Sequence, residues 1–337
     1  MPNLTAKWRS IHESDILRRS SQIVSVANNQ VYIFGGELRP REPRDNDIHI
    51  LSLENDTAHL TTTPSTAQSP SPSPRVGSAS TTLNNQIYLF SGRGGVAMAP
   101  IDEQGSLWML DATSSKWTLV APTDSSPIPA ARSYHCMASD GNDTLYLHAG
   151  CPEKGRLSDL WAFSLSSKQW TQLASAPDPA RGGTSIAFAE GLLYRMNGFD
   201  GVTEQGGSVD IYDPGTDSWT TVSYTPDGVS GPTPRSVGAL LPVTVDGRKY
   251  LVTLFGERDP SSLGHQGAGK MLDDVWAFDL GGKVWVQVDG QADAEGHRPA
   301  ARGWFDADII NENKIIVQGG LGESNERLGD VWSLYFS

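Results

Sequence analysis

The sequence predicts an all-β chain made of six similar antiparallel units, and three observations support this fold class. Residues 132–173 divide into four short strands of alternating apolar and polar residues, separated by turn-rich polar segments. An arginine opens the first strand of each unit, at Arg19, Arg75, Arg132, Arg181, Arg235 and Arg302. A pair of mostly small residues closes each second strand, at 35–36, 91–92, 149–150, 197–198, 255–256 and 319–320.

The later strands of the units repeat as well. Fourth-strand tryptophans stand at Trp117, Trp170, Trp219 and Trp285, and His59 takes the equivalent place in the first unit. A single four-stranded sheet would leave two apolar faces in water, so the copies must pack against one another. The whole chain, residues 1–337, is used by the repeats. We therefore predict one domain, a six-bladed β-propeller.

The sixth unit ends after its third strand, and the missing strand is predicted at the other end of the chain. Residues 5–11 carry Trp8 in a fourth-strand context. Pairing of this segment with the last unit would close the ring and remove an exposed strand edge. The predicted blades are 19–62, 75–120, 132–173, 181–222, 235–288, and 302–337 together with 5–11.

The composition excludes several classes of function. The formal net charge is −13 and the pI is about 4.9. No basic run interrupts this acidic balance, so neither nucleic acid nor an anionic membrane is an expected partner. The sequence has no apolar segment of membrane-spanning length and no signal-peptide core, and Cys136 and Cys151 form no disulfide framework. We predict a cytoplasmic protein.

The repeated arginines allow two interpretations, which the sequence leaves open. In the first, each arginine caps carbonyl groups between blades, which explains why it recurs. In the second, several arginines line one mouth of the central channel and bind a carboxylate, sulfate or other anionic group. Under this second interpretation Arg132, Arg235 and Arg302 orient the ligand, with Arg19, Arg75 and Glu37 as further substrate-binding candidates.

The residues after each arginine differ from unit to unit, as the lining of a pocket would. The large members are Tyr134, His135, Trp304 and Phe305. We predict that they contact substrate, with packing between blades as the alternative.

A loop of the fifth unit, residues 257–274, holds the candidate catalytic pair. Glu257 and His265 are eight residues apart, with Asp259 between them. A carboxylate and an imidazole can transfer protons. Two such groups alone are a weak metal signal. The sequence contains no nucleophile elbow and no dinucleotide fingerprint.

The chain also resembles known proteins. The segments FGGELRPREPRDNDIHILSL, GERDPSSLGHQGAGKMLDDVWAFD and QGGLGESNERLGDVW are similar to the kelch propellers of plant specifier proteins (the epithiospecifier, nitrile-specifier and thiocyanate-forming group) and related fungal-type stand-alone kelch proteins. That resemblance implies a Glu-x3-Asp-x3-His set for ferrous iron and arginines that hold an anionic substrate. Glu257 and His265 match the set, but Ser261 replaces its middle ligand. We therefore expect no cofactor.

Stand-alone kelch propellers also include non-redox tailoring enzymes of microbial secondary metabolism, among them cyclases. The resemblance therefore implies a small-molecule-binding propeller that steers a rearrangement or cyclisation of a reactive metabolite, as a pericyclase or a specifier-like lyase would. Such a reaction needs positioning and water exclusion more than a nucleophile. The alternative is a non-catalytic scaffold that binds a protein partner.

Overall fold

The computed structural model describes residues 4–54, 57–66, 69–123 and 127–337. Nearly all regular structure in these ranges is β-strand, which confirms the predicted all-β class. Two short 3-10 helices, η1 (Asp15–Leu17) and η2 (Gly264–Gln266), lie in loops. Within the described residues, no helix is long and apolar enough to cross a membrane.

The first three units each form an antiparallel sheet whose strands follow one another in sequence. The first contains β2 (Ser20–Ala27), β3 (Gln30–Arg39), β5 (Ile48–Glu54) and β6 (Thr57–Thr63), and β4 (Glu42–Pro43) pairs with β3. The second contains β8 (Ala79–Leu83), β9 (Gln86–Phe90), β12 (Leu107–Asp111) and β13 (Lys116–Val120). The third contains β14 (Cys136–Ser139), β15 (Thr144–Gly150), β16 (Leu157–Ser164) and β17 (Gln169–Leu173).

The next two units repeat this order. The fourth sheet contains β18 (Ser185–Ala189), β19 (Leu192–Met196), β20 (Ser208–Asp213) and β21 (Ser218–Ser223). The fifth contains β22 (Ala239–Val245), β23 (Arg248–Leu254), β26 (Val275–Asp279) and β27 (Val284–Gln287). Shorter pairs shape the loops: β7 (Arg75–Val76), β10 (Arg93–Gly94) and β11 (Ala99–Pro100) near the second sheet, and β24 (Glu257–Arg258) with β25 (Lys270–Met271) near the fifth.

The last sheet combines the two ends of the chain. Strands β29 (Asp306–Asn311), β30 (Lys314–Gln318) and β31 (Asp330–Phe336) are followed outward by β1 (Ala6–Glu13) and β28 (Gly290–Gln291). Strand β1 pairs antiparallel with β31, so that Trp8 lies opposite Leu334. Trp8 is 3% exposed and stacks on Phe255 of the preceding sheet at a ring-centroid distance of 5.6 Å.

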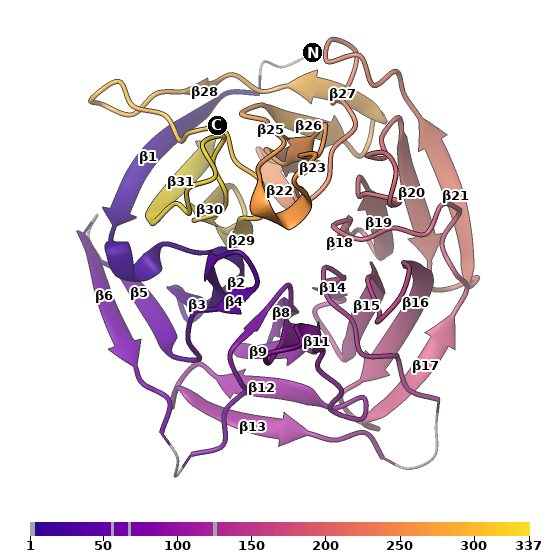
Figure 1. Cartoon of the computed structure of the whole chain (residues 1–337). Helices are drawn as coiled ribbons and strands as arrows, with labels where there is room; N and C mark the ends of the chain where they lie inside the picture. Colours follow the sequence, from indigo (N-terminus) through magenta and orange to yellow (C-terminus); the bar gives the residue numbers. More distant parts are fainter. Residues whose placement is uncertain (1–3, 55–56, 67–68, 124–126) are drawn as a thin grey trace.

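Figure 1 shows the sheets arranged around a common centre, with the first strand of each unit nearest to it. The apolar core lies between neighbouring sheets rather than in one place. One cluster joins Tyr32 and Phe34 of the first sheet to Ile87, Leu89 and Trp117 of the second. Each sheet has two apolar faces, and stacking on both neighbours buries them.

The repeated arginines stabilise this arrangement. All six are buried, and each donates from Nη1 to the carbonyl of the first residue of its own unit's small pair, at distances from 2.7 to 3.1 Å. Five of them also bind a carboxylate of the same unit: Asp45, Glu103, Asp159, Asp274 or Asp330. Arg181 forms no such ion pair among the described residues, since Ser208 stands where the third, fifth and sixth units carry the aspartate, and burial lowers the pKa of Arg181 to about 10.

Candidate functional site

A cavity of about 370 Å³ lies at one mouth of the central opening. Its wall contains the residue that directly follows each small pair, and we call these six residues the mouth ring: Glu37, Arg93, Cys151, Phe199, Glu257 and Leu321. Each pairs by backbone with the residue after the repeated arginine of its unit, as in Ser236 with Glu257. The repeat therefore places six side chains, of five different types, at equivalent positions around one hollow.

A second circle is built from the residue two places after each repeated arginine, and four of its six members, Tyr134, Gly183, Val237 and Trp304, form the floor of the cavity. We call these six the collar: Ser21, Gly77, Tyr134, Gly183, Val237 and Trp304. All six have left-handed backbone conformations, with φ between 48° and 61°. Such φ values are unfavourable for bulky side chains, so the surrounding structure must stabilise them.

Main-chain hydrogen bonds between successive collar residues provide that stabilisation. Each collar N–H donates to the carbonyl of the preceding unit's collar residue, and Ser21 N–H donates to Trp304 O, which completes a circle. The six N–H to O distances lie between 2.7 and 3.0 Å. The collar thus has a fixed circumference, and only its side chains vary.

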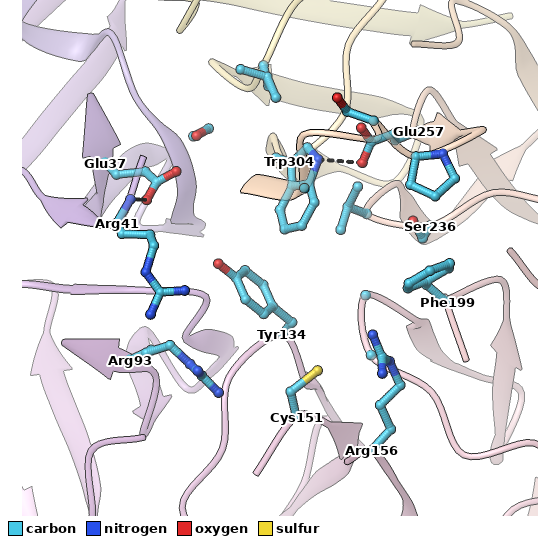
Figure 2. A pocket seen from close by; sticks show the side chains of 18 of the residues that line it. Glu37, Arg41, Arg93, Tyr134, Cys151, Arg156, Phe199, Ser236, Glu257 and Trp304 are labelled. Atoms are coloured by element: carbon cyan, nitrogen blue, oxygen red, sulfur yellow. Dashed lines mark hydrogen bonds between the residues drawn. The ribbon is translucent and has the colours of Figure 1, made fainter. Parts of the chain in front are cut away.

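Three arginines other than the six repeated ones give the cavity a cationic side. Arg93 Nε donates to Ser133 Oγ at 3.1 Å, and its Nη2 donates to Pro152 O at 3.3 Å. Arg156 lies over the Phe199 ring, 5.0 Å from its centroid, and its buried Nε–H has no hydrogen-bond partner among the described residues. Arg41 extends toward the same hollow (Figure 2). Within the described ranges, no carboxylate forms an ion pair with any of these three guanidinium groups.

Cys151 lies between Arg93 and Arg156 (Figure 2). Burial raises the pKa of its thiol, and the two arginines oppose that rise. A neutral thiol beside two guanidinium groups neutralises neither of them, so this side of the cavity keeps its positive charge.

The opposite side of the cavity is acidic. Glu257 is 5% exposed, and both of its oxygens accept hydrogen bonds, Oε1 from Gly269 N at 2.6 Å and Oε2 from Trp304 Nε1 at 2.8 Å. Burial raises the pKa of Glu257 although these two donors oppose the shift. Glu204 lies near it, and burial raises the pKa of that carboxyl too, with a smaller contribution from the charge of Glu257. The cavity therefore has guanidinium groups on one side and carboxyl groups with raised pKa on the other.

Glu37 and Arg327 neutralise each other at the edge of the cavity. Arg327 Nη2 lies 2.9 Å from Glu37 Oε1, and Glu37 Oε2 also accepts from Arg41 N at 2.7 Å. This pair fixes the loop that carries Arg41 and leaves the guanidinium of Arg41 in the hollow.

The structure brings together some of the residues predicted from sequence. Glu37, Tyr134, Glu257 and Trp304 all line the cavity. The backbone of His265 lies in η2, but its side chain is outside the described residues. Other candidates lie elsewhere: His135 and Phe305 border the channel beneath the collar, and the repeated arginines Arg19, Arg75, Arg132, Arg235 and Arg302 lie buried among carbonyls and carboxylates.

The arginines are structural, as in the first of the two interpretations above, but the carbonyl that each one binds belongs to its own unit and not to a neighbouring blade. Burial and the charge of Arg132 lower the pKa of His135 to about 3, so its ring is neutral at ordinary pH. Phe305 packs edge to face on Phe255, 5.4 Å between ring centroids. These contacts hold the sheets together.

Sequence reasoning missed Arg41, Arg93, Arg156, Cys151 and Phe199. A signal for three of them was present, since Arg93, Cys151 and Phe199 directly follow a small pair. Arg41 lies in the loop after β3, and Arg156 lies in the loop after β15. Both loops begin at the mouth ring, on the same side of the molecule. Their approach to one hollow depends on loop conformation, for which the repeat gives no rule.

The described residues do not fit the ferrous iron set of the plant proteins. Both oxygens of Glu257 already accept from N–H groups, and Ser261 supplies a hydroxyl where a carboxylate is needed. In the ranges that the structure describes, no three His, Cys, Asp or Glu side chains are placed to hold a metal together. We derive no chemistry through iron.

The chain repeats a four-stranded sheet around a central opening, and its loops form a pocket at one mouth of that opening. This arrangement defines a kelch-repeat β-propeller protein. Residues 21–256 match the KLHDC2/KLHL20/DRC7 Kelch-repeats domain, and the chain belongs to this family.

The chain is also similar to individual proteins of known name. It is 28% identical over 343 residues to N-(sulfonatooxy)prop-2-enimidothioate sulfolyase of Thlaspi arvense, covering 93% of this chain and 91% of that protein. This likeness confirms the resemblance to plant specifier-type proteins. Tip elongation aberrant protein 1 of Schizosaccharomyces pombe is 30% identical over 56% of this chain. Kelch domain-containing protein 2 of Bos taurus is 30% identical over 41% of this chain. These matches span only 16% and 31% of the two proteins.

Proposed function

We propose that the cavity binds a compact metabolite carrying a sulfonatooxy or similar oxyanion group and steers its non-redox rearrangement, cyclisation or elimination. The observation that carries this proposal is that Arg41, Arg93 and Arg156 line the cavity and form no ion pair with a carboxylate of the described residues. Guanidinium groups are strong donors to oxyanions, so such groups in the wall of a hollow, without a carboxylate to neutralise them, favour an anionic ligand.

The two sides of the cavity have different roles in this proposal. Arg93 and Arg156 bind the oxyanion and stabilise negative charge that develops on it as a bond to it breaks. Glu257 lies across the cavity, and its raised pKa allows it to hold a proton at higher pH than an exposed glutamate would. Its contacts with Gly269 and Trp304 fix its orientation. The sulfonatooxy group in the name of the Thlaspi arvense relative suggests this class of ligand.

The proposal can be tested with simple oxyanions. Inorganic sulfate and ethyl sulfate are titrated into the protein by isothermal calorimetry. We expect Arg93→Gln and Arg156→Gln each to weaken binding about 10- to 100-fold, the value of one charge-assisted hydrogen bond, without changing Tm. Arg248→Gln, at the exposed start of β23 and outside the cavity wall, is the matched control. Equal affinity in all variants, or no binding at millimolar concentration, would reject the proposal.

The proposal includes the assembly of the sheets as one closed six-bladed ring, with the sequence-derived blade limits. Two features support it: the pairing of β1 with β31, and the circle of six collar hydrogen bonds. A rigid ring suits the proposed function because it holds side chains from all six units at constant distances around the ligand.

A second candidate function is a scaffold that binds a protein partner. It is favoured by apolar side chains in loops that follow the mouth ring, where Val96, Val202 and Leu263 have exposed fractions of 107%, 81% and 69%. Substitution of all three by Ser should abolish partner binding under this alternative. The same substitutions should leave sulfate affinity unchanged if the cavity is the functional site.

A further inference from the structure

A second hollow lies on the same axis, beneath the collar. This channel has a volume of about 450 Å³ and is lined by the first strands of the units. Four residues border both the channel and the cavity, namely Tyr134, Gly183, Val237 and Trp304. All four belong to the collar. The collar is therefore the partition between the two hollows.

The side chains of the collar, and not its backbone, fill the opening. Tyr134 and Trp304 meet edge to face, 5.2 Å between ring centroids and 84° between planes. The ring of Tyr134 lies over Gly77, where an added Cβ would be only 2.7 Å from Tyr134 Cε1. Its hydroxyl lies beside Ser21. Tyr134, from the third unit, thus reaches residues of the first, second and sixth units.

The remaining collar positions are complementary to this arrangement. Val237 leans over Gly183, where an added Cβ would lie 2.8 Å from Val237 Cγ1. Gly77 and Gly183 have no side chain, and the space is occupied by the side chains of Tyr134 and Val237. Because six hydrogen bonds fix the circumference, the collar cannot widen to admit a ligand unless these side chains move.

We propose that Tyr134, held by Trp304 and Gly77, is a specificity-determining residue that sets the depth of the cavity and so the length of the substrate it accepts. This inference rests on the proposed function. Its substrate is a molecule with an oxyanion at the arginine side and an apolar part that ends on the Tyr134 and Trp304 rings. A longer apolar part would have to enter the channel, which the floor prevents.

The test uses a series of n-alkyl sulfates from methyl to octyl sulfate, titrated into wild type, Tyr134→Phe and Tyr134→Gly. Glycine suits the left-handed backbone here, because Gly77 and Gly183 occupy equivalent collar positions at φ of 61° and 60°. Phenylalanine keeps the ring and is the matched control. Trp304 is left unchanged because it also holds Glu257.

For wild type and Tyr134→Phe, we expect the affinity to rise by about three- to fourfold per methylene and then to stop rising at one chain length. For Tyr134→Gly, the rise should continue for at least two further methylenes, while inorganic sulfate binds as in wild type. The same limiting chain length in Tyr134→Gly would overturn the inference, and it would leave the proposed function standing.

A crystal structure of Tyr134→Gly tests the floor without any ligand. We expect one continuous hollow from the cavity into the channel. Two separate hollows, with Trp304 or another side chain closing the gap, would overturn the inference even if no alkyl sulfate binds to any variant. Failure of all alkyl sulfates to bind wild type would instead reject the proposed function.

Discussion

Arg132 and Asp159 form a buried two-point ion pair, with Nη1 to Oδ1 at 2.7 Å and Nη2 to Oδ2 at 2.8 Å. The same carboxylate accepts from Trp161 Nε1 at 2.7 Å. The fifth and sixth units repeat this set with Asp274 and Trp276, and with Asp330 and Trp332. In these three units the repeated arginine and the Asp-x-Trp motif thus form one buried hydrogen-bond network, in which the aspartate binds both the guanidinium and the indole N–H.

Replacement of Arg132 should therefore destabilise the fold. Arg132→Ala removes the donor to the Ala149 carbonyl and the cation paired with the Asp159 carboxylate, which keeps only its bond from Trp161. We expect the free energy of unfolding to fall by about 3–5 kcal/mol, as for other broken buried ion pairs. Denaturant melts measure this, with exposed Arg248→Ala as the control. An unchanged midpoint for Arg132→Ala would mean that the arginine serves the ligand and not the fold.

Trp8 should contribute more to stability than its place at the N-terminal end suggests. It packs on Phe255 and, edge to face, on Trp332 at 6.5 Å between ring centroids. Trp8→Ala should cost about 3–5 kcal/mol, and deletion of residues 1–12 should expose the edge of β31 and promote aggregation. Lys7→Ala, on the exposed face of the same strand, is the control. Equal thermal melts for both point variants would contradict closure of the ring by this strand.

Asp306 and Asp308 should make stability depend on pH. Both lie on β29 and accept backbone N–H groups of β2, Val24 N to Asp306 Oδ2 at 2.6 Å and Val26 N to Asp308 Oδ2 at 2.7 Å. Burial raises the pKa of Asp306 to about 7 and that of Asp308 to about 6. The folded state thus binds their protons more tightly than the unfolded state, so the contribution of these two groups to stability is fully present at low pH and is lost as pH rises through these values.

Asparagine at both positions cannot ionise and should remove this contribution. We expect the Tm of Asp306→Asn/Asp308→Asn, relative to wild type, to be lowest near pH 5 and to increase by at least about 2 °C by pH 8. Asp246→Asn, in an exposed turn, serves as the control. A Tm difference that stays constant from pH 5 to 8 would show that these carboxylates do not titrate in that range.

Iron content tests the substitution at position 261. We expect well under one iron per chain in protein purified without added metal, because Ser261 takes the place of a carboxylate ligand. Ser261→Asp should raise ferrous affinity about 10-fold or more if the loop can present its ligands, and Ser262→Asp next to it should not. Near one iron per chain in wild type, by elemental analysis, would refute this prediction.

The sequence by itself determined the all-β class and the kelch repeat, because hydrophobic alternation, turn residues and recurring arginines are local and repeat in every unit. It also pointed to Glu257, Glu37, Tyr134 and Trp304, which the structure places at the cavity. The arginine and the Asp-x-Trp motif could have been matched to each other, since they occur together in the third, fifth and sixth units.

Only the tertiary structure decided which charges face a ligand. The repeated arginines are structural, because they donate hydrogen bonds to carbonyls and, in five units, to a carboxylate of the same unit. Arg93 and Arg156 come from different units, more than 60 residues apart in sequence, and meet beside Cys151 only because the sheets stack around a centre. The floor formed by Tyr134 and Trp304 depends likewise on packing across that centre, and no period in a single sequence records such contacts.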